Sequence, residues 1–258
     1  MKWPKSFVLI RHDVSVYNSL RFVKEKDPEY KKFLKEWERK PDSSEARVLA
    51  KKLYKKFMLK VGDADTPLID ENGDNAYKTG LALSENKEIT PPDIIFVSPY
   101  KRTLSTLNHL TRGWPALSLV KIYEEERIRE QEHGLSSLYN DWRIFFTLHP
   151  DQMLLQKKEG RYWYRWPQGE NVADVRERNR SLVATLIREF QNLNVLVVSH
   201  HLNILATRAN LERLNAEEFI RLDNEEKPVN CGVTLYRGNP HKGQNGKLEL
   251  VFYNKKFY

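Results

Sequence analysis

Residues 7–18 read FVLIRHDVSVYN, a stretch that joins an apolar run to a charged pair. Four apolar residues come first, and Arg11-His12 closely follows them. Residues 94–97 (IIFV) and 195–198 (VLVV) are two further apolar runs bounded by polar residues. Short runs rich in β-branched side chains are typical of strands buried in a parallel sheet. Helical patterns separate the runs, which predicts an α/β fold, a three-layer, doubly wound, mostly parallel sheet flanked by helices.

The segment that follows the first strand has a different, helical character. Asp27-Pro28 is a favourable helix start, since aspartate caps a helix and proline suits its first position. Pro41 ends this helix, Ser43 offers a cap for a second one, and Gly62 is expected to close it. The pattern therefore predicts an inserted helical hairpin over about residues 20–62.

The last part of the chain returns to strands. Residues 233–236 and 248–253 read as two more strands around a turn-rich stretch. No internal period repeats along the chain, so we expect a single domain over residues 1–258, with the hairpin as an inserted cap. The insert leaves the sheet edge directly after Asn18, and we therefore expect it to cap the site at that edge.

Composition limits the partners and the compartment. The formal net charge of +8 favours anionic ligands in general, but no known nucleic-acid-binding motif accompanies it. Cys231 is the only cysteine, which excludes an internal disulfide and a thiolate metal site. No apolar stretch approaches the roughly 20 residues that span a bilayer, and the first apolar run is too short for a secretion signal. The sequence predicts a cytoplasmic protein without a membrane partner.

Polar residues follow each of the three buried strands. In open parallel sheets, ligands bind beyond the carboxyl ends of the strands, so these residues should meet at one edge. They are Arg11-His12, Ser98-Pro99-Tyr100-Lys101-Arg102 and Ser199-His200-His201. Arginine forks match phosphate oxygens and a neutral imidazole is a competent nucleophile, so this set suits phosphoryl transfer without a metal. Ser98 as helix cap with Pro99 in the first turn would add N–H donors for an anion.

These residues resemble the motifs of the histidine phosphatases, the superfamily that includes the cofactor-dependent phosphoglycerate mutases. Residues 9–18 match the family's Arg-His-Gly signature except at Asp13. Five more blocks follow in the family's order. They are Thr66-Pro67-Leu68 with Gly73, residues 98–102 with Thr106, residues 129–134, residues 166–170 with Asp174 and Arg178, and residues 197–200.

The resemblance implies a role for each site residue. His12 would attack phosphorus and become phosphorylated, while Arg11, Arg102 and His200 would hold the phosphoryl oxygens. Ser15 and Asn18 would add hydrogen bonds at the lip of the pocket. Of the adjacent histidines, His200 is preferred over His201 because it directly follows the strand.

The resemblance also implies a general acid/base that protonates the leaving alkoxide and then activates water. Glu130 is the preferred residue. Glu125, Glu126 and Glu132 lie close by, and the sequence does not fix which of the four acids points inward. His133 and Glu170 are expected to be structural.

Two residues depart from the family pattern. Asp13 stands in place of a glycine and would repel a phosphate dianion unless its carboxylate is protonated or turned away. His201 also stands in place of a glycine and crowds the loop of the second histidine. Either change could narrow the substrate range, alter the pH dependence or reduce activity.

The sequence therefore predicts a metal-independent phosphomonoester hydrolase, without a cofactor, acting through a phosphohistidine on a small phosphorylated metabolite. One alternative is a phosphotransferase of the phosphoglycerate mutase type. Another is a catalytically weak regulatory protein that binds a phosphorylated ligand, which Asp13 favours. The sequence determines neither the natural substrate nor the oligomeric state.

Overall fold

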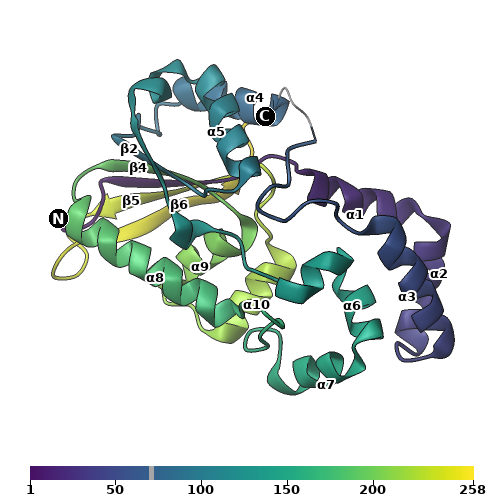
Figure 1. Ribbon diagram of the computed structural model, residues 1–258. Helices are drawn as coiled ribbons and strands as arrows, with labels where there is room; N and C mark the ends of the chain where they lie inside the picture. The colour runs from purple at the N-terminus through teal and green to yellow at the C-terminus, as the bar shows by residue number, and fades with distance from the viewer. Residues whose placement is uncertain (70–72) are drawn as a thin grey trace.

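The computed structural model describes residues 1–69 and 73–258, and a mixed six-stranded sheet forms its centre (Figure 1). The strand order is β3-β2-β4-β1-β5-β6. The first four of these strands run parallel, while β5 is antiparallel to β1 and β6 is antiparallel to β5. The strands are β1 (Ser6–Arg11), β2 (Ile94–Val97), β3 (Lys121–Glu124), β4 (Asn194–Ser199), β5 (Val233–Asn239) and β6 (Lys247–Lys255).

Ten α-helices and three short 3₁₀ helices occupy the described residues. The α-helices are α1 (Val16–Lys26), α2 (Pro28–Arg39), α3 (Ser44–Phe57), α4 (Asp74–Ser84), α5 (Lys101–Gly113), α6 (Trp142–Leu148), α7 (Pro150–Glu159), α8 (Val172–Glu189), α9 (His201–Glu212) and α10 (Ala216–Glu225). The 3₁₀ helices are η1 (Pro115–Leu119), η2 (Glu126–Ile128) and η3 (Gly134–Tyr139). None of the helices in residues 1–69 and 73–258 is long and apolar enough to cross a membrane.

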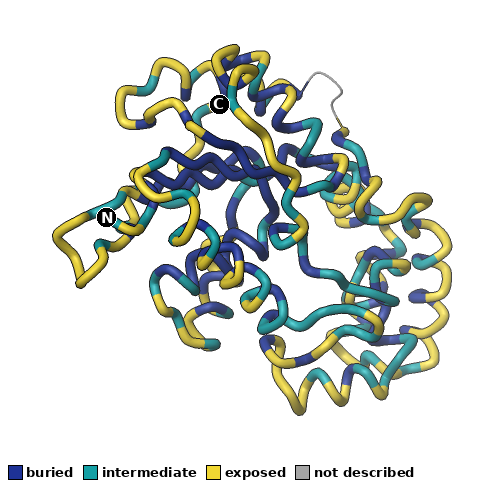
Figure 2. The backbone as a smooth tube through the Cα atoms, turned by 60° about the vertical axis from the view of Figure 1, so that its left-hand side comes forward, coloured by how far each residue is buried: buried dark blue, intermediate teal, exposed yellow. Residues whose placement is uncertain are grey.

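Side chains alternate across β1, and this alternation creates the three layers. Val8 and Ile10 pack into the core formed with α4 and α5. Phe7 and Leu9 pack on the opposite face, into the core formed with α8 and α9. Figure 2 shows the central strands as the most continuously buried part of the chain. The predicted three-layer α/β fold is confirmed.

Strand register brings the polar residues to one edge. Arg11, the last residue of β1, pairs with Ser199 at the end of β4. Val97, the last residue of β2, pairs with Val198. Three parallel strands therefore end at nearly the same level, and the residues that follow them emerge together.

The inserted region contains three helices. α2 starts as predicted, with Asp27 as its cap and Pro28 in its first turn, and Ser43 caps α3. The prediction that Gly62 closes the second helix is wrong, because α3 already ends at Phe57 and Met58 takes up an extended backbone. The hairpin is also preceded by α1, which begins before residue 20.

The inserted helices form a small core of their own. Apolar side chains of α2 and α3, including Phe33 and Leu53, pack against Ile144 of α6. Lys24 of α1 is buried and forms an ion pair with Asp141 at the start of α6, with 3.0 Å between Nζ and Oδ2. Figure 1 shows α1, α2 and α3, with α6 and α7, beyond the carboxyl end of β1. The insert thus lies on the side of the sheet where the predicted site residues emerge.

Candidate active site

Two histidines meet beyond the ends of β1 and β4. His12 is 3% exposed and His200 is fully buried, and their ring centroids are 5.2 Å apart in an edge-on arrangement. Arg11 is the last residue of β1, and Arg102 lies in the first turn of α5 with a buried side chain. The structure therefore brings together the four residues that the sequence places at the centre of the site.

A backbone hydrogen bond fixes the tautomer of His12. Its Nδ1 lies 2.6 Å from the carbonyl oxygen of Asp13. A carbonyl oxygen can only accept, so Nδ1 carries the hydrogen and donates it. The unprotonated nitrogen of a neutral His12 ring is therefore Nε2, which is the atom available for nucleophilic attack.

The surroundings also keep this ring neutral. Burial, with the positive charges of Arg102 and Arg11, holds the pKa of His12 well below its ordinary value of 6.5. Burial and Arg102 lower the pKa of His200 in the same way. Both imidazoles are thus uncharged at neutral pH, and the arginines supply the positive charge of the pocket.

Two buried nitrogens in the pocket lack a partner. Within the part of the chain that the structure describes, neither Nε of Arg11 nor Nδ1 of His200 has a hydrogen-bond partner. The other ends of both groups are held, since Nη1 of Arg11 donates to the carbonyl oxygen of Pro228 at 2.6 Å and Nε2 of His200 lies 2.8 Å from Oγ of Ser98. A buried unpaired donor costs about 1–3 kcal/mol. When the hydrogen of the His200 ring is on Nδ1, an oxyanion that accepts from both nitrogens would remove that cost.

The predicted cap of α5 is wrong. The helix begins at Lys101, its cap residue is Tyr100, and no side chain caps its N-terminus. Ser98 is turned instead toward His200, as described above. Arg102 still lies in the first turn, where its guanidinium stacks 4.8 Å from the ring centroid of Tyr100.

Ser15 and Asn18 form the capping box of α1. The Ser15 hydroxyl donates to Oδ1 of Asn18 at 3.0 Å, and the same oxygen accepts from the backbone N–H of Ser15. Nδ2 of Asn230 also reaches Oδ1 at 3.3 Å and donates to the carbonyl oxygen of His12 at 2.9 Å. Oδ1 of Asn18 points toward the capping box, so Nδ2 of the same side chain points away from it. The roles of Ser15 and Asn18 in phosphate binding stay predictions.

The carboxylate of Asp13 turns away from His12 and caps α4. Oδ2 accepts from the backbone N–H of Ala76 at 3.0 Å. Oδ1 accepts from Nδ2 of Asn75 at 3.1 Å and from the backbone N–H of Val14 at 2.7 Å. The N-terminus of a helix favours a negative charge. Of the orientations that the sequence allowed, the structure has the one in which Asp13 points out of the pocket.

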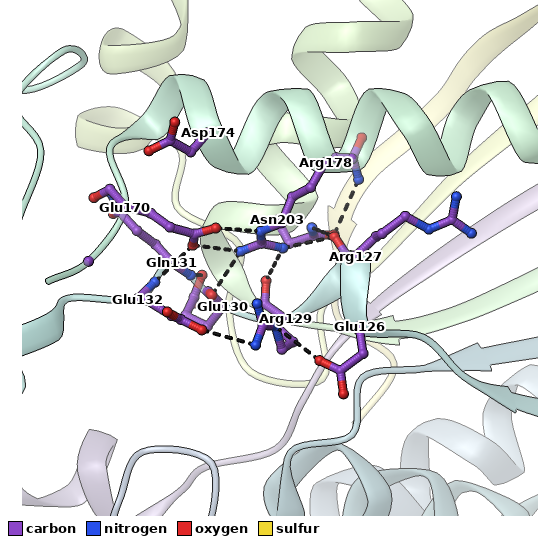
Figure 3. A network of polar contacts seen from close by, with 12 residues as sticks. Glu126, Arg127, Arg129, Glu130, Gln131, Glu132, Glu170, Asp174, Arg178 and Asn203 are labelled. Atoms are coloured by element: carbon purple, nitrogen blue, oxygen red, sulfur yellow. Dashed lines mark hydrogen bonds and ion pairs between the residues drawn. The ribbon is translucent and has the colours of Figure 1, made fainter.

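Four acids compete for the role of general acid/base, and their partners differ. Glu125 pairs with Arg127. Glu126 and Glu132 pair with Arg129 (Figure 3). Glu130 has no arginine partner among the described residues. Its Oε1 accepts from the backbone N–H of Leu202 at 3.1 Å, which places the carboxylate at the first turn of α9, the helix that His200 precedes. This position favours Glu130 over its three neighbours.

Arg178 organises this acidic block from α8. Its guanidinium donates to the backbone carbonyl oxygens of Arg127, Arg129 and Glu130 at 2.8–2.9 Å (Figure 3). It also forms a two-pronged ion pair with Glu170, with 2.8 Å between Nε and Oε1. Arg178 thus fixes the backbone from which Glu130 projects, and Glu170 has the structural role that the sequence predicts.

His201 faces away from the pair of catalytic candidates. Its Nε2 lies 2.8 Å from Oδ1 of Asp223, a fully buried carboxylate on α10 that also pairs with Arg161. His201 therefore links the start of α9 to α10. The preference for His200 agrees with this geometry.

Sequence reasoning missed two contributors to the site. Asp63 forms an ion pair with Arg102, with 3.0 Å between Oδ1 and Nη1, and Asn230 supports His12 through its backbone. Asp63 lies just before Thr66-Pro67-Leu68, which the sequence does single out, so proximity to that block was the available signal. The sequence gives no such signal for Asn230, because its contact with His12 spans more than two hundred residues of sequence.

The fold and the pocket together define an α/β protein with two neutral histidines and two arginines at the carboxyl edge of a parallel sheet. Residues 55–249 match the family model of the histidine phosphatase superfamily, branch 1, and the chain belongs to this superfamily. The matched residues begin within the insert, so the assignment of His12 rests on the geometry described above.

Several known proteins resemble this chain. A phosphoglycerate mutase-like protein of Arabidopsis thaliana is 27% identical over 231 residues, which are 86% of this chain and 70% of the relative. A second one is 31% identical over 169 residues, 62% of this chain and 49% of the relative. A mycobacterial glucosyl-3-phosphoglycerate phosphatase, solved with inorganic phosphate, has a TM-score of 0.63 at 18% identity and covers 98% of each chain. At this identity the structural likeness concerns the fold.

Proposed function

We propose that the protein is a metal-independent phosphomonoester hydrolase that acts on a small phosphorylated metabolite through a phosphohistidine on His12. One observation carries the proposal. The free Nε2 of His12 belongs to the same buried cluster as two nitrogens that have no hydrogen-bond partner among the described residues, Nε of Arg11 and Nδ1 of His200. A phosphoryl group is the ligand that offers an electrophilic centre together with several oxygen acceptors.

His12 would act as the nucleophile, and Arg11 and His200 would stabilise the transferred phosphoryl group. Nε2 of His12 attacks phosphorus, and the bond from phosphorus to the ester oxygen breaks in line with it. Arg11 and His200 donate to the equatorial oxygens, where charge accumulates. For His200 this requires the Ser98 hydroxyl to donate to Nε2, which leaves the hydrogen on Nδ1.

Glu130 would act first as the general acid and then as the general base. It gives a proton to the departing alkoxide and then takes one from the water that attacks the phosphohistidine. This second attack restores His12 and releases inorganic phosphate. Arg178 would act through Glu130 by holding its backbone, so we regard Arg178 as a positioning residue.

The orientation of Asp13 bears on the regulatory alternative. That alternative drew support from a carboxylate expected beside the nucleophile, whereas the carboxylate caps α4 instead. The mutase alternative draws on a different observation, since the named Arabidopsis relatives are phosphoglycerate mutase-like proteins. A mutase would pass the phosphoryl group to a second hydroxyl rather than to water.

Turnover of p-nitrophenyl phosphate and of a panel of small phosphomonoesters tests the proposal. The reaction is run from about pH 4 to about pH 9 with EDTA present, and the wild-type protein is compared with His12→Asn and with His241→Asn as an exposed histidine control. We expect phosphate release by the wild type and the control, and none by His12→Asn. Activity that chelation abolishes and a divalent ion restores would contradict the metal-independent mechanism. Transfer to an added phosphorylated acceptor in preference to water would favour the mutase.

A further inference from the structure

The guanidinium expected to hold phosphate is already held by a carboxylate of the same chain. Nη1 of Arg102 donates to Oδ1 of Asp63 at 3.0 Å, and Nη2 donates to Oδ2 at 3.3 Å. The Arg102 side chain is 4% exposed and the Asp63 side chain is 32% exposed, so the contact is part-buried and solvent reaches the carboxylate. Asp63 thus presents two carboxylate oxygens to Arg102, which is the same fork-to-fork geometry that a phosphate would use.

Backbone contacts hold the Asp63 segment in place independently of its carboxylate. The carbonyl oxygen of Asp63 accepts from Nη1 of Arg102 at 2.6 Å. The next carbonyl, that of Ala64, accepts from the backbone N–H of Lys101 at 2.9 Å. The Asp63 side chain is therefore not needed to hold this segment against α5, and its negative charge can act on the pocket instead.

The charge of Asp63 acts within the pocket. Burial, together with Asp63, raises the pKa of Tyr100 to about 12. The ring of Tyr100 lies 5.0 Å from the ring of His200, so Asp63 is close to the histidine pair. With both histidines neutral, Arg11 and Arg102 supply the positive charge, and the ion pair with Asp63 offsets the charge of Arg102. A phosphate dianion would enter a pocket in which the charge of Arg102 is already offset by a carboxylate.

We infer that Asp63 competes with the phosphoryl group of the substrate for Arg102 and so sets how tightly the site holds phosphate. This inference rests on the proposed function, because it treats the pocket as a phosphate site. A ligand gains the full contact with Arg102 only by displacing the Asp63 carboxylate. Inorganic phosphate, the product, has no other group to offset that cost and is therefore released readily.

Binding of inorganic phosphate, measured by isothermal titration calorimetry at fixed pH and salt, tests the inference. Asp63→Asn removes the charge but keeps the shape and an oxygen acceptor. Asp65→Asn is the matched control, because Asp65 is an exposed acid two residues further along the same segment. We expect Asp63→Asn to lower the phosphate Kd about tenfold, equivalent to about 1.4 kcal/mol, and Asp65→Asn to leave it within about twofold. An Asp63→Asn Kd no lower than that of the control, including no measurable binding in either protein, would overturn the inference.

A double-variant cycle then asks whether Asp63 acts through Arg102. In an Arg102→Ala background, Asp63→Asn should no longer improve phosphate binding by more than about twofold. The same tenfold gain without Arg102 would show that Asp63 repels phosphate from a distance, and competition for Arg102 would be wrong.

The proposed function can fail separately. If wild-type protein hydrolyses no phosphomonoester, the phosphate titrations still report on Asp63. If it hydrolyses them and Asp63→Asn binds phosphate no better, only the inference about Asp63 fails.

Discussion

Replacing Asp13 should damage stability rather than improve catalysis. In Asp13→Ala, the N–H of Ala76 and the amide of Asn75 lose their acceptor at a position that is 4% exposed. Loss of a helix cap costs about 0.5–2 kcal/mol, and a buried unpaired donor adds about 1–3 kcal/mol, so we expect a loss of about 2–4 kcal/mol. For a chain of this size, Tm should fall by roughly 5–10 °C.

Thermal unfolding by scanning calorimetry measures this loss, and Asp65→Ala serves as the exposed control. Phosphate affinity and turnover at neutral pH are measured on the same proteins below Tm. We expect the variant to bind phosphate no more tightly than wild type, because the missing carboxylate faced α4 and not the pocket. An unchanged Tm together with tighter phosphate binding would show that Asp13 repels the ligand, and our account of its orientation would be refuted.

Three further predictions concern the rest of the site. The pKa of His200 in the folded protein lies well below 6.5, so as the pH falls the unfolded chain takes up a proton on this histidine before the folded protein does. The free energy of unfolding should therefore decrease as the pH drops below about 6.5. Urea titrations at several pH values should show that the free energy of unfolding depends less on pH in His200→Asn than in the wild type. Arg178→Ala leaves the Glu170 carboxylate without its partner and should cost about 3–5 kcal/mol in urea unfolding, whereas pairing it with Glu170→Gln should recover part of the loss; no recovery would contradict the ion-pair account. Gly169→Ala would place its Cβ against the carbonyl oxygen of Glu132, and we expect lower kcat and lower Tm; wild-type values for both would disprove the close approach.

Strands and helix starts with local signals could be predicted from the sequence. The apolar runs before Arg11 and before Ser199 predict the central strands β1 and β4, because a strand buried on both faces needs continuous apolar residues. Asp27-Pro28 marked the start of α2 because capping depends on neighbouring residues. By contrast, the sequence does not predict β3. All of its residues are exposed at the sheet edge, so Lys121–Glu124 carries no apolar run.

Features that depend on distant contacts could not be predicted. Ser98 was expected to cap α5, but its partner is His200, which lies 102 residues away in sequence. The direction of the Asp13 carboxylate depends on Ala76, 63 residues further along the chain. The convergence of the two histidines was predictable because strand ends in a parallel sheet share one edge. The pairing of Arg102 with Asp63 was not, because it depends on where the chain returns from the insert.

The phosphohistidine itself is the most direct test of the central claim. Wild-type protein is mixed with a phosphomonoester carrying labelled phosphate, quenched by alkali within its first turnovers, and digested for peptide mapping. We predict acid-labile, alkali-stable phosphate on His12, formed and lost at rates that account for turnover, and no label in His12→Asn. Turnover without phosphate on His12, or label on another residue, would contradict the account.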